Sequence, residues 1–119
     1  MAAGLAVLRE LNAPGAYERL EDLATDLKER VRSAARRHVL GVQTPGVGSV
    51  FSIVFADAEP RSYRDLSHAD ASRRRMLDLR LLASGVYSRA GDRFNLSLAH
   101  TDADVATAGE AIDRAMSGL

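Results

Sequence analysis

The sequence predicts one domain of the α/β (α+β) class, in which helices pack on a small, mostly antiparallel sheet of three or four strands. Three observations indicate this. Residues 16 to about 39 place apolar side chains at helical spacing. Residues 48–55 alternate as in a strand, and the last strand-like segment runs into a capped helix. The order helix, helix, strand, strand, helix, strand, strand, helix completes the prediction.

Length and composition set limits on function. The 119 residues form one domain, which at this size buries roughly two-thirds of its unfolded surface. Sixteen basic residues balance sixteen acidic ones, so no net field attracts nucleic acid or an anionic membrane. The absence of cysteine excludes disulfides and thiolate metal sites. No apolar run approaches the ~20 residues of a membrane span, and we expect a soluble, cytoplasmic protein.

The N-terminal half predicts two helices and two strands. Residues 2–11 form an apolar helix that ends before Pro14-Gly15, and residues 16 to about 39 form a long amphipathic helix. Residues 40–44 predict a short strand and residues 48–55 a longer one, followed by a loop over residues 56–66. Both faces of the longer strand are largely apolar, so we expect both to be covered.

The C-terminal half begins with a helix from Ser67 or His68 to the cap residue Gly85. Its predicted buried stripe consists of Ala69, Met76, Leu79, Leu82 and Ala83.

A short strand at residues 85–87, a turn at residues 90–92 and a strand ending near His100 should follow. The last helix spans residue 102 to about residue 116. Thr101 is its predicted N-cap, because the hydroxyl can accept from the amide of Asp104.

Few side chains are candidates for chemistry. His100 has polar neighbours but no evident catalytic partner, so we expect a structural role. Asp102 and Asp104 are spaced for capping rather than for calcium. His38 and His68 lack a second ligand at a zinc-like spacing, and no metal site is predicted.

The basic residues are interpreted in the same way. Arg73-Arg74-Arg75 point in three directions on a helix, so a solvated face is favoured over a nucleic-acid site. Lys28, the only lysine, lies between acidic neighbours in mid-helix and is a poor candidate for a Schiff base.

The C-terminal segments resemble a known family. They read Gly85-Val86-Tyr87, a loop, and then Ser97-Leu98-Ala99-His100-Thr101-Asp102-Ala103-Asp104-Val105. This pattern resembles the C-terminal small domain of class III pyridoxal-phosphate-dependent aminotransferases, and most closely the glutamate-1-semialdehyde aminomutases. Residues 1–8, Gly15 to Leu20 and Gly48 to Ser52 agree in the same order. The resemblance implies the small-domain fold of fold-type I enzymes.

The resemblance also implies what the chain lacks. In the family, the Schiff-base lysine, the aspartate on the pyridinium nitrogen and the phosphate-binding loop all lie upstream, in a large domain. Residues 1–14 would be the helix that joins this missing large domain, and residues 15–119 the small domain. We therefore expect the isolated chain to bind no pyridoxal phosphate and to be inactive, with no catalytic or cofactor-binding residue of its own.

One loop bears on the substrate. Residues 88–94 are shorter than the matching loop of many aminomutases and are differently charged. In the family this loop approaches the mouth of the active site, so the resemblance implies that Asp92 and Arg93 face substrate in the complete enzyme. The difference keeps a general aminotransferase as open as an aminomutase.

An alternative function is a stand-alone interaction module. The first helix carries Leu5, Ala6, Leu8 and Leu11, which would normally pack on the missing domain. Left uncovered, these side chains favour a homo-oligomer, namely a homodimer.

Overall fold

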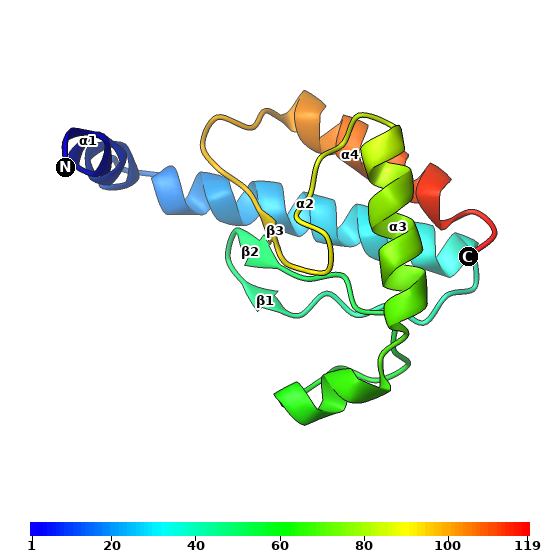
Figure 1. Ribbon diagram of the computed structural model, residues 1–119. Coiled ribbons are helices and arrows are strands. Elements are labelled where there is room, and N and C mark those ends of the chain that lie inside the picture. The colour runs from blue at the N-terminus through cyan, green and yellow to red at the C-terminus, as the bar shows by residue number, and fades with distance from the viewer.

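Four α-helices, one 3-10 helix and a three-stranded antiparallel sheet form the computed structural model, which describes residues 1–119 (Figure 1). In chain order the elements are α1 (Ala2–Leu11), α2 (Ala16–Arg37), β1 (Gly46–Val47), β2 (Val50–Phe51), η1 (Tyr63–His68), α3 (Ala71–Ala83), β3 (Phe94–Asn95) and α4 (Asp102–Met116). The strand order is β1-β2-β3. The predicted fold class is confirmed.

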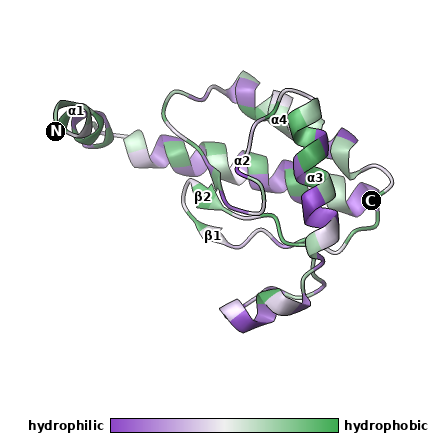
Figure 2. Cartoon of the chain, in the orientation of Figure 1, coloured by the Kyte–Doolittle hydropathy of each residue, from purple (hydrophilic) through white to green (hydrophobic).

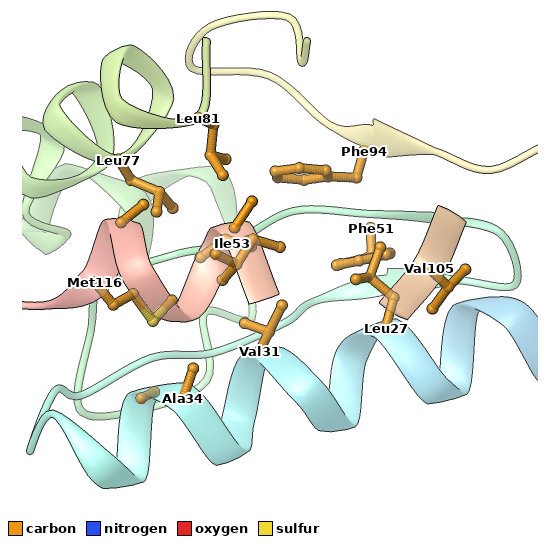
Figure 3. Close-up of a cluster of buried hydrophobic side chains, with 14 of the residues drawn as sticks. Leu27, Val31, Ala34, Phe51, Ile53, Leu77, Leu81, Phe94, Val105 and Met116 are labelled. Atoms are coloured by element: carbon orange, nitrogen blue, oxygen red, sulfur yellow. The ribbon is translucent and has the colours of Figure 1, made fainter. Parts of the chain in front are cut away.

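The core lies between the long helix α2, helices α3 and α4, and one face of the sheet (Figure 3). Leu27 and Val31 of α2 point toward Phe51 and Ile53, which are fully buried. The ring of Phe51 stacks on that of Phe94, with ring centroids 5.6 Å apart, and so fixes β3 against β2. Helices α2 and α4 approach closely at Gly109, where a Cβ atom would lie 2.6 Å from the Cδ atom of Arg30.

Helix α4 begins where the sequence predicts. Thr101 is its N-cap, and its hydroxyl accepts from the amide of Asp104 at 3.2 Å. The Asp104 carboxylate accepts in return from the Thr101 amide at 2.8 Å, which completes a capping box. These bonds, led by that from the Thr101 backbone N–H, hold the pKa of Asp104 below its usual value.

The strands are shorter than predicted. Residues 40–44 and 48–55 pair only through the two-residue strands β1 and β2 and one bridge between Gln43 and Val54. Pro45 lies between these pairings, and its missing N–H prevents a continuous ladder. Phe51, Ile53 and Phe55 are buried, as the alternation predicts. On the other face Val54 is also buried, but Val50 and Ser52 are only half-buried. The expected cover on both faces is therefore incomplete within this chain.

The predicted strand at residues 85–87 is absent. The amide of Val86 instead bonds to the carbonyl of Leu81 at 2.9 Å, and that of Gly85 to Leu82 at 3.1 Å. Gly85 has a φ of +85°, so these bonds form a Schellman cap on α3. The prediction that Gly85 caps this helix is confirmed.

The prediction for α3 is wrong in two respects. Residues 63–68 form the separate helix η1, and α3 begins only after its cap residue Asp70. The buried stripe of α3 consists of Arg74, Leu77, Asp78 and Leu81. Met76, Leu79 and Leu82 are 45%, 54% and 57% exposed. The helix is apolar on two faces, and this chain covers only one of them.

Helix α1 stands away from the rest of the chain (Figure 1). It contains no buried residue, and Leu5, Val7 and Leu8 are more than half exposed. Figure 2 shows that hydrophobic residues predominate in this helix. None of the helices combines the length and the apolar character needed to cross a membrane.

Removing a core side chain between α4 and α2 should destabilise the fold. Ile112 is fully buried, so we expect Ile112→Ala to lower the free energy of unfolding by about 2–5 kcal/mol. Leu5→Ala in the exposed helix α1 is the control and should change it by less than about 0.5 kcal/mol. Urea denaturation followed by circular dichroism measures both, and equal effects would contradict the core described above.

The capping carboxylate should make stability dependent on pH. The unfolded chain binds the Asp104 proton at higher pH than the folded chain, because folding lowers this pKa. The stabilisation is therefore present above the unfolded pKa of about 4 and lost as pH falls through the folded value. We expect Asp104→Asn to be less stable than the original chain at about pH 6, with the difference shrinking below about pH 4. Urea denaturation at each pH measures the free energy of unfolding of both chains. A difference between them that stays the same from about pH 6 to below about pH 4 would contradict this prediction.

Candidate functional site

The loop of residues 86–93 is the candidate site, because it carries both residues that the family resemblance implies face substrate. The Schellman cap at Gly85 turns the chain at the end of α3. Val86 then packs against the hydrophobic core, and the loop returns to β3 along α3. Its start is thus fixed by α3 and its end by the stacked ring of Phe94.

A buried ion pair fixes the middle of this loop. The Nε atom of Arg74 donates to both carboxylate oxygens of Asp78, at 3.0 and 3.2 Å. The Nη1 atom donates to the carbonyl of Ile53 at 2.8 Å, and Nη2 donates to the carbonyl of Asp92 at 2.7 Å. The Asp78 carboxylate also accepts from the amide of Gly91 at 2.7 Å. The pair therefore joins α3, the segment after β2 and the loop.

This arrangement corrects the interpretation of the arginine run. Arg74 and Asp78 are 8% and 6% exposed, and the guanidinium of Arg74 lies 5.4 Å from the centre of the Phe94 ring. Arg73 and Arg75 are exposed, as predicted. The sequence analysis missed Arg74 and Asp78. The sequence does contain one sign of this pair. Opposite charges stand four residues apart on a helix, and leucines lie on either side of Asp78.

The structure brings Asp92 and Arg93 together with a second arginine. The Asp92 carboxylate lies 3.3 Å from Nε of Arg89 and 3.5 Å from Nε of Arg93. The backbone N–H of Arg93 holds the pKa of Asp92 below its usual value, against the opposing effect of burial and with help from the charge of Arg89. Both arginines are largely exposed. The cluster can pair with an ionic group of a substrate.

The remaining sequence candidates lie outside this loop. His100 accepts from the amide of Ser97 through Nδ1 at 3.0 Å. His38 contacts Asp113 at 3.0 Å beside Arg37, whose hydrogen bond lowers the pKa of that carboxyl. No three histidine, aspartate or glutamate side chains gather closely enough to hold a metal ion.

Lys28 lies on α2 beside the sheet. Its Nζ atom is 3.5 Å from the carbonyl of Gly48 and 5.4 Å from the centre of the Phe51 ring. These contacts occupy the ammonium group with a carbonyl and an aromatic face.

An open cleft of about 800 Å³ adjoins the loop. One wall is α3, the second is the chain at residues 52–55, and Tyr87, Ser88, Ala90 and Gly91 of the loop form the third. Leu66 and Ala69, at the end of η1 and after it, close one end. Ten of its eighteen lining residues are hydrophobic.

The known proteins that this chain resembles are enzymes several times its length. No family model matches this chain. A glutamate-1-semialdehyde 2,1-aminomutase of Deinococcus radiodurans is 36% identical over 126 residues, and one of Akkermansia muciniphila is 33% identical over 121 residues. Both alignments cover 100% of this chain and 28% of the relative. The solved β-phenylalanine aminotransferase of Variovorax paradoxus is 32% identical with a TM-score of 0.83, over 95% of this chain and 26% of that enzyme.

Breaking the buried ion pair should destabilise the chain far more than changing a neighbouring arginine. Arg74→Met leaves the Asp78 charge buried without its partner, so we expect a loss of about 3–5 kcal/mol in the free energy of unfolding. Arg75→Met is the matched control and should change it by less than about 0.5 kcal/mol.

The double variant Arg74→Met/Asp78→Leu should recover part of that loss, because it removes both charges. Urea denaturation measures all three variants. A loss in Arg74→Met no greater than in Arg75→Met would contradict the role of the pair.

Proposed function

We propose that this chain, which matches the C-terminal portion of the class III pyridoxal-phosphate-dependent aminotransferases, is the small domain that shapes the substrate cleft of such an enzyme. The observation that carries the proposal is the alignment of the whole chain with just over a quarter of each relative, together with the matching fold. The homologous complete enzymes depend on pyridoxal phosphate. When bound, that cofactor supplies the Schiff-base chemistry for transfer of an amino group.

In this proposal, the cluster of Arg89, Asp92 and Arg93 on the loop binds and orients the substrate. Arg89 and Arg93 present guanidinium groups to solvent, and the Asp92 carboxylate between them is ionised at neutral pH because its pKa is lowered. Such a cluster favours a substrate with a carboxylate and an amino group, since each charge finds its opposite. Both an aminotransferase and an aminomutase act on substrates of this class. The complete enzyme would be a cytoplasmic homo-oligomer.

The isolated chain should not bind the cofactor covalently. Lys28 is the only lysine, and its contacts with Gly48 and Phe51 do not prepare it for Schiff-base formation. After addition of pyridoxal phosphate we expect no absorbance band beyond that of the free cofactor. Borohydride reduction followed by mass spectrometry should detect no adduct on Lys28, with Lys28→Arg as the control. A stoichiometric adduct that is lost in Lys28→Arg would contradict the prediction.

A chimera tests the proposed function directly. The portion of the Deinococcus radiodurans relative that aligns with this chain is replaced by residues 1–119. We expect the chimera to fold, to retain pyridoxal phosphate through gel filtration and to transfer amino groups. A folded chimera without any transfer from the amino donors and acceptors tested, including glutamate 1-semialdehyde, would overturn the proposal.

The same chimera tests the substrate-facing residues. We expect Arg93→Ala to raise KM by about tenfold with a smaller change in kcat, because a lost ionic contact of roughly 1.4 kcal/mol weakens binding of substrate by that factor. Arg73→Ala, on the exposed face of α3, is the matched control and should leave both constants unchanged. Equal KM values for Arg93→Ala and the unchanged chimera would show that Arg93 does not contact the substrate.

The alternative is a stand-alone dimerising module. The exposed leucines of α1 favour it, because they form an apolar surface that nothing in this chain covers. Sedimentation velocity distinguishes the two functions. A dimer that Leu5→Glu/Leu8→Glu converts to a monomer would support the module, and a strict monomer at about 100 μM would count against it, since typical homodimer interfaces bind more tightly than that.

A further inference from the structure

We infer that Arg74 is a positioning residue for the substrate. With its partner Asp78 it fixes the turn that carries the charged cluster of Arg89, Asp92 and Arg93, and so determines where that cluster meets a substrate. The inference rests on the proposed function, in which the cluster binds the substrate. It adds two residues whose side chains are almost fully buried and therefore act only through the backbone that they hold.

The three charged residues of the cluster belong to one tight turn. The amide of Asp92 donates to the carbonyl of Arg89 at 3.0 Å, which closes a turn over residues 89–92. Gly91 has a φ of +70°, as the third position of a type II turn requires. Arg89 and Asp92 are therefore the first and last residues of the turn, and Arg93 follows it. The turn sets how the charges stand relative to one another, but not where they stand on the domain.

The buried pair fixes the position of this turn on α3. The Asp78 carboxylate accepts from the amide of Gly91 at 2.7 Å, and Nη2 of Arg74 donates to the carbonyl of Asp92 at 2.7 Å. Two consecutive residues of the turn are thus held, one through its donor and the other through its acceptor. Two such bonds oppose rotation of the turn as well as its displacement, which one bond alone would not do.

This role requires the guanidinium group itself and not only a positive charge. Nε of Arg74 donates to Asp78, Nη1 donates to the carbonyl of Ile53, and Nη2 donates to that of Asp92. A lysine in its place keeps a cation beside Asp78, but its single nitrogen lacks the planar fork that reaches both carbonyls. Arg74→Lys should therefore leave the buried charge of Asp78 compensated while it frees the carbonyl of Asp92. The substitution separates positioning of the turn from compensation of the buried charge.

The chimera measures the effect of this substitution on the substrate. We expect Arg74→Lys to raise KM by about threefold to tenfold with less than about a twofold change in kcat, because the cluster is present but displaced from its substrate. Arg73→Lys is the matched control, with the same substitution at an exposed position of α3, and should leave both constants unchanged. An unchanged KM in folded Arg74→Lys would overturn the inference.

A double-variant cycle distinguishes positioning from a general loss of structure. If Arg74 acts through the cluster, its substitution matters less once Arg93 has been removed. We expect Arg74→Lys to raise KM by less than about twofold when it is added to Arg93→Ala. The same fold rise in both backgrounds would overturn the inference. A general loss of structure would instead lower the fraction of active enzyme, which reduces the apparent kcat and leaves KM unchanged.

A second variant covers the case in which Arg74→Lys does not fold. Arg74→Met/Asp78→Leu removes both bonds to the turn and leaves no unpaired buried charge, so it should fold and raise KM in the same way. If the unchanged chimera transfers no amino group, the proposed function fails, and this inference fails with it. If the unchanged chimera is active and the folded double variant has the same KM, the inference alone is overturned.

Discussion

The buried pair of Arg74 and Asp78 is the interaction on which the loop between α3 and β3 depends. Burying two charges costs several kcal/mol each, and the cost is offset only when every polar atom finds a partner. Here the guanidinium bonds to a carboxylate and two carbonyls and lies over an aromatic ring, while the carboxylate also accepts a backbone amide. The bonded backbone atoms belong to residues 53, 91 and 92. One ion pair therefore positions a loop that has no regular hydrogen-bonding ladder.

The loop needs such an anchor because its surroundings provide little else. The sheet is built of two-residue strands, and β3 begins only at Phe94. Between the cap at Gly85 and Phe94, Val86 is the one side chain that joins the hydrophobic core. The planar guanidinium of Arg74 reaches two carbonyls in different directions, which a lysine could not do with the same fixed geometry. The positions of Asp92 and Arg93 thus follow from a residue that touches neither of their side chains.

The sequence predicts the helices and their caps well, and the sheet and the α3 face poorly, for physical reasons. The periodicity of α2 and the N-cap at Thr101 are local signals, and both are confirmed. The length of a strand depends on how far a neighbouring segment continues to pair with it. The alternation of residues 48–55 does not contain that information. On α3, the stripe of Met76, Leu79 and Leu82 predicts a buried face as strongly as Leu77 and Leu81 do. Which face of α3 is buried depends on the elements that pack against it, and the sequence of the helix does not name them. Arg74 likewise cannot be told from the exposed arginines beside it until its contacts are known.

The candidate site shows the same division. Asp92 and Arg93 follow from the family resemblance, whereas their anchoring by Arg74 and Asp78 has no signal beyond an i, i+4 charge pair in a leucine-rich helix. The open cleft beside α3 depends on the same anchor, because the loop at residues 87–91 is one of its walls and residues 91 and 92 carry the backbone atoms that the ion pair holds. The shape of the cleft and the placement of Asp92 and Arg93 therefore depend on the same few backbone bonds.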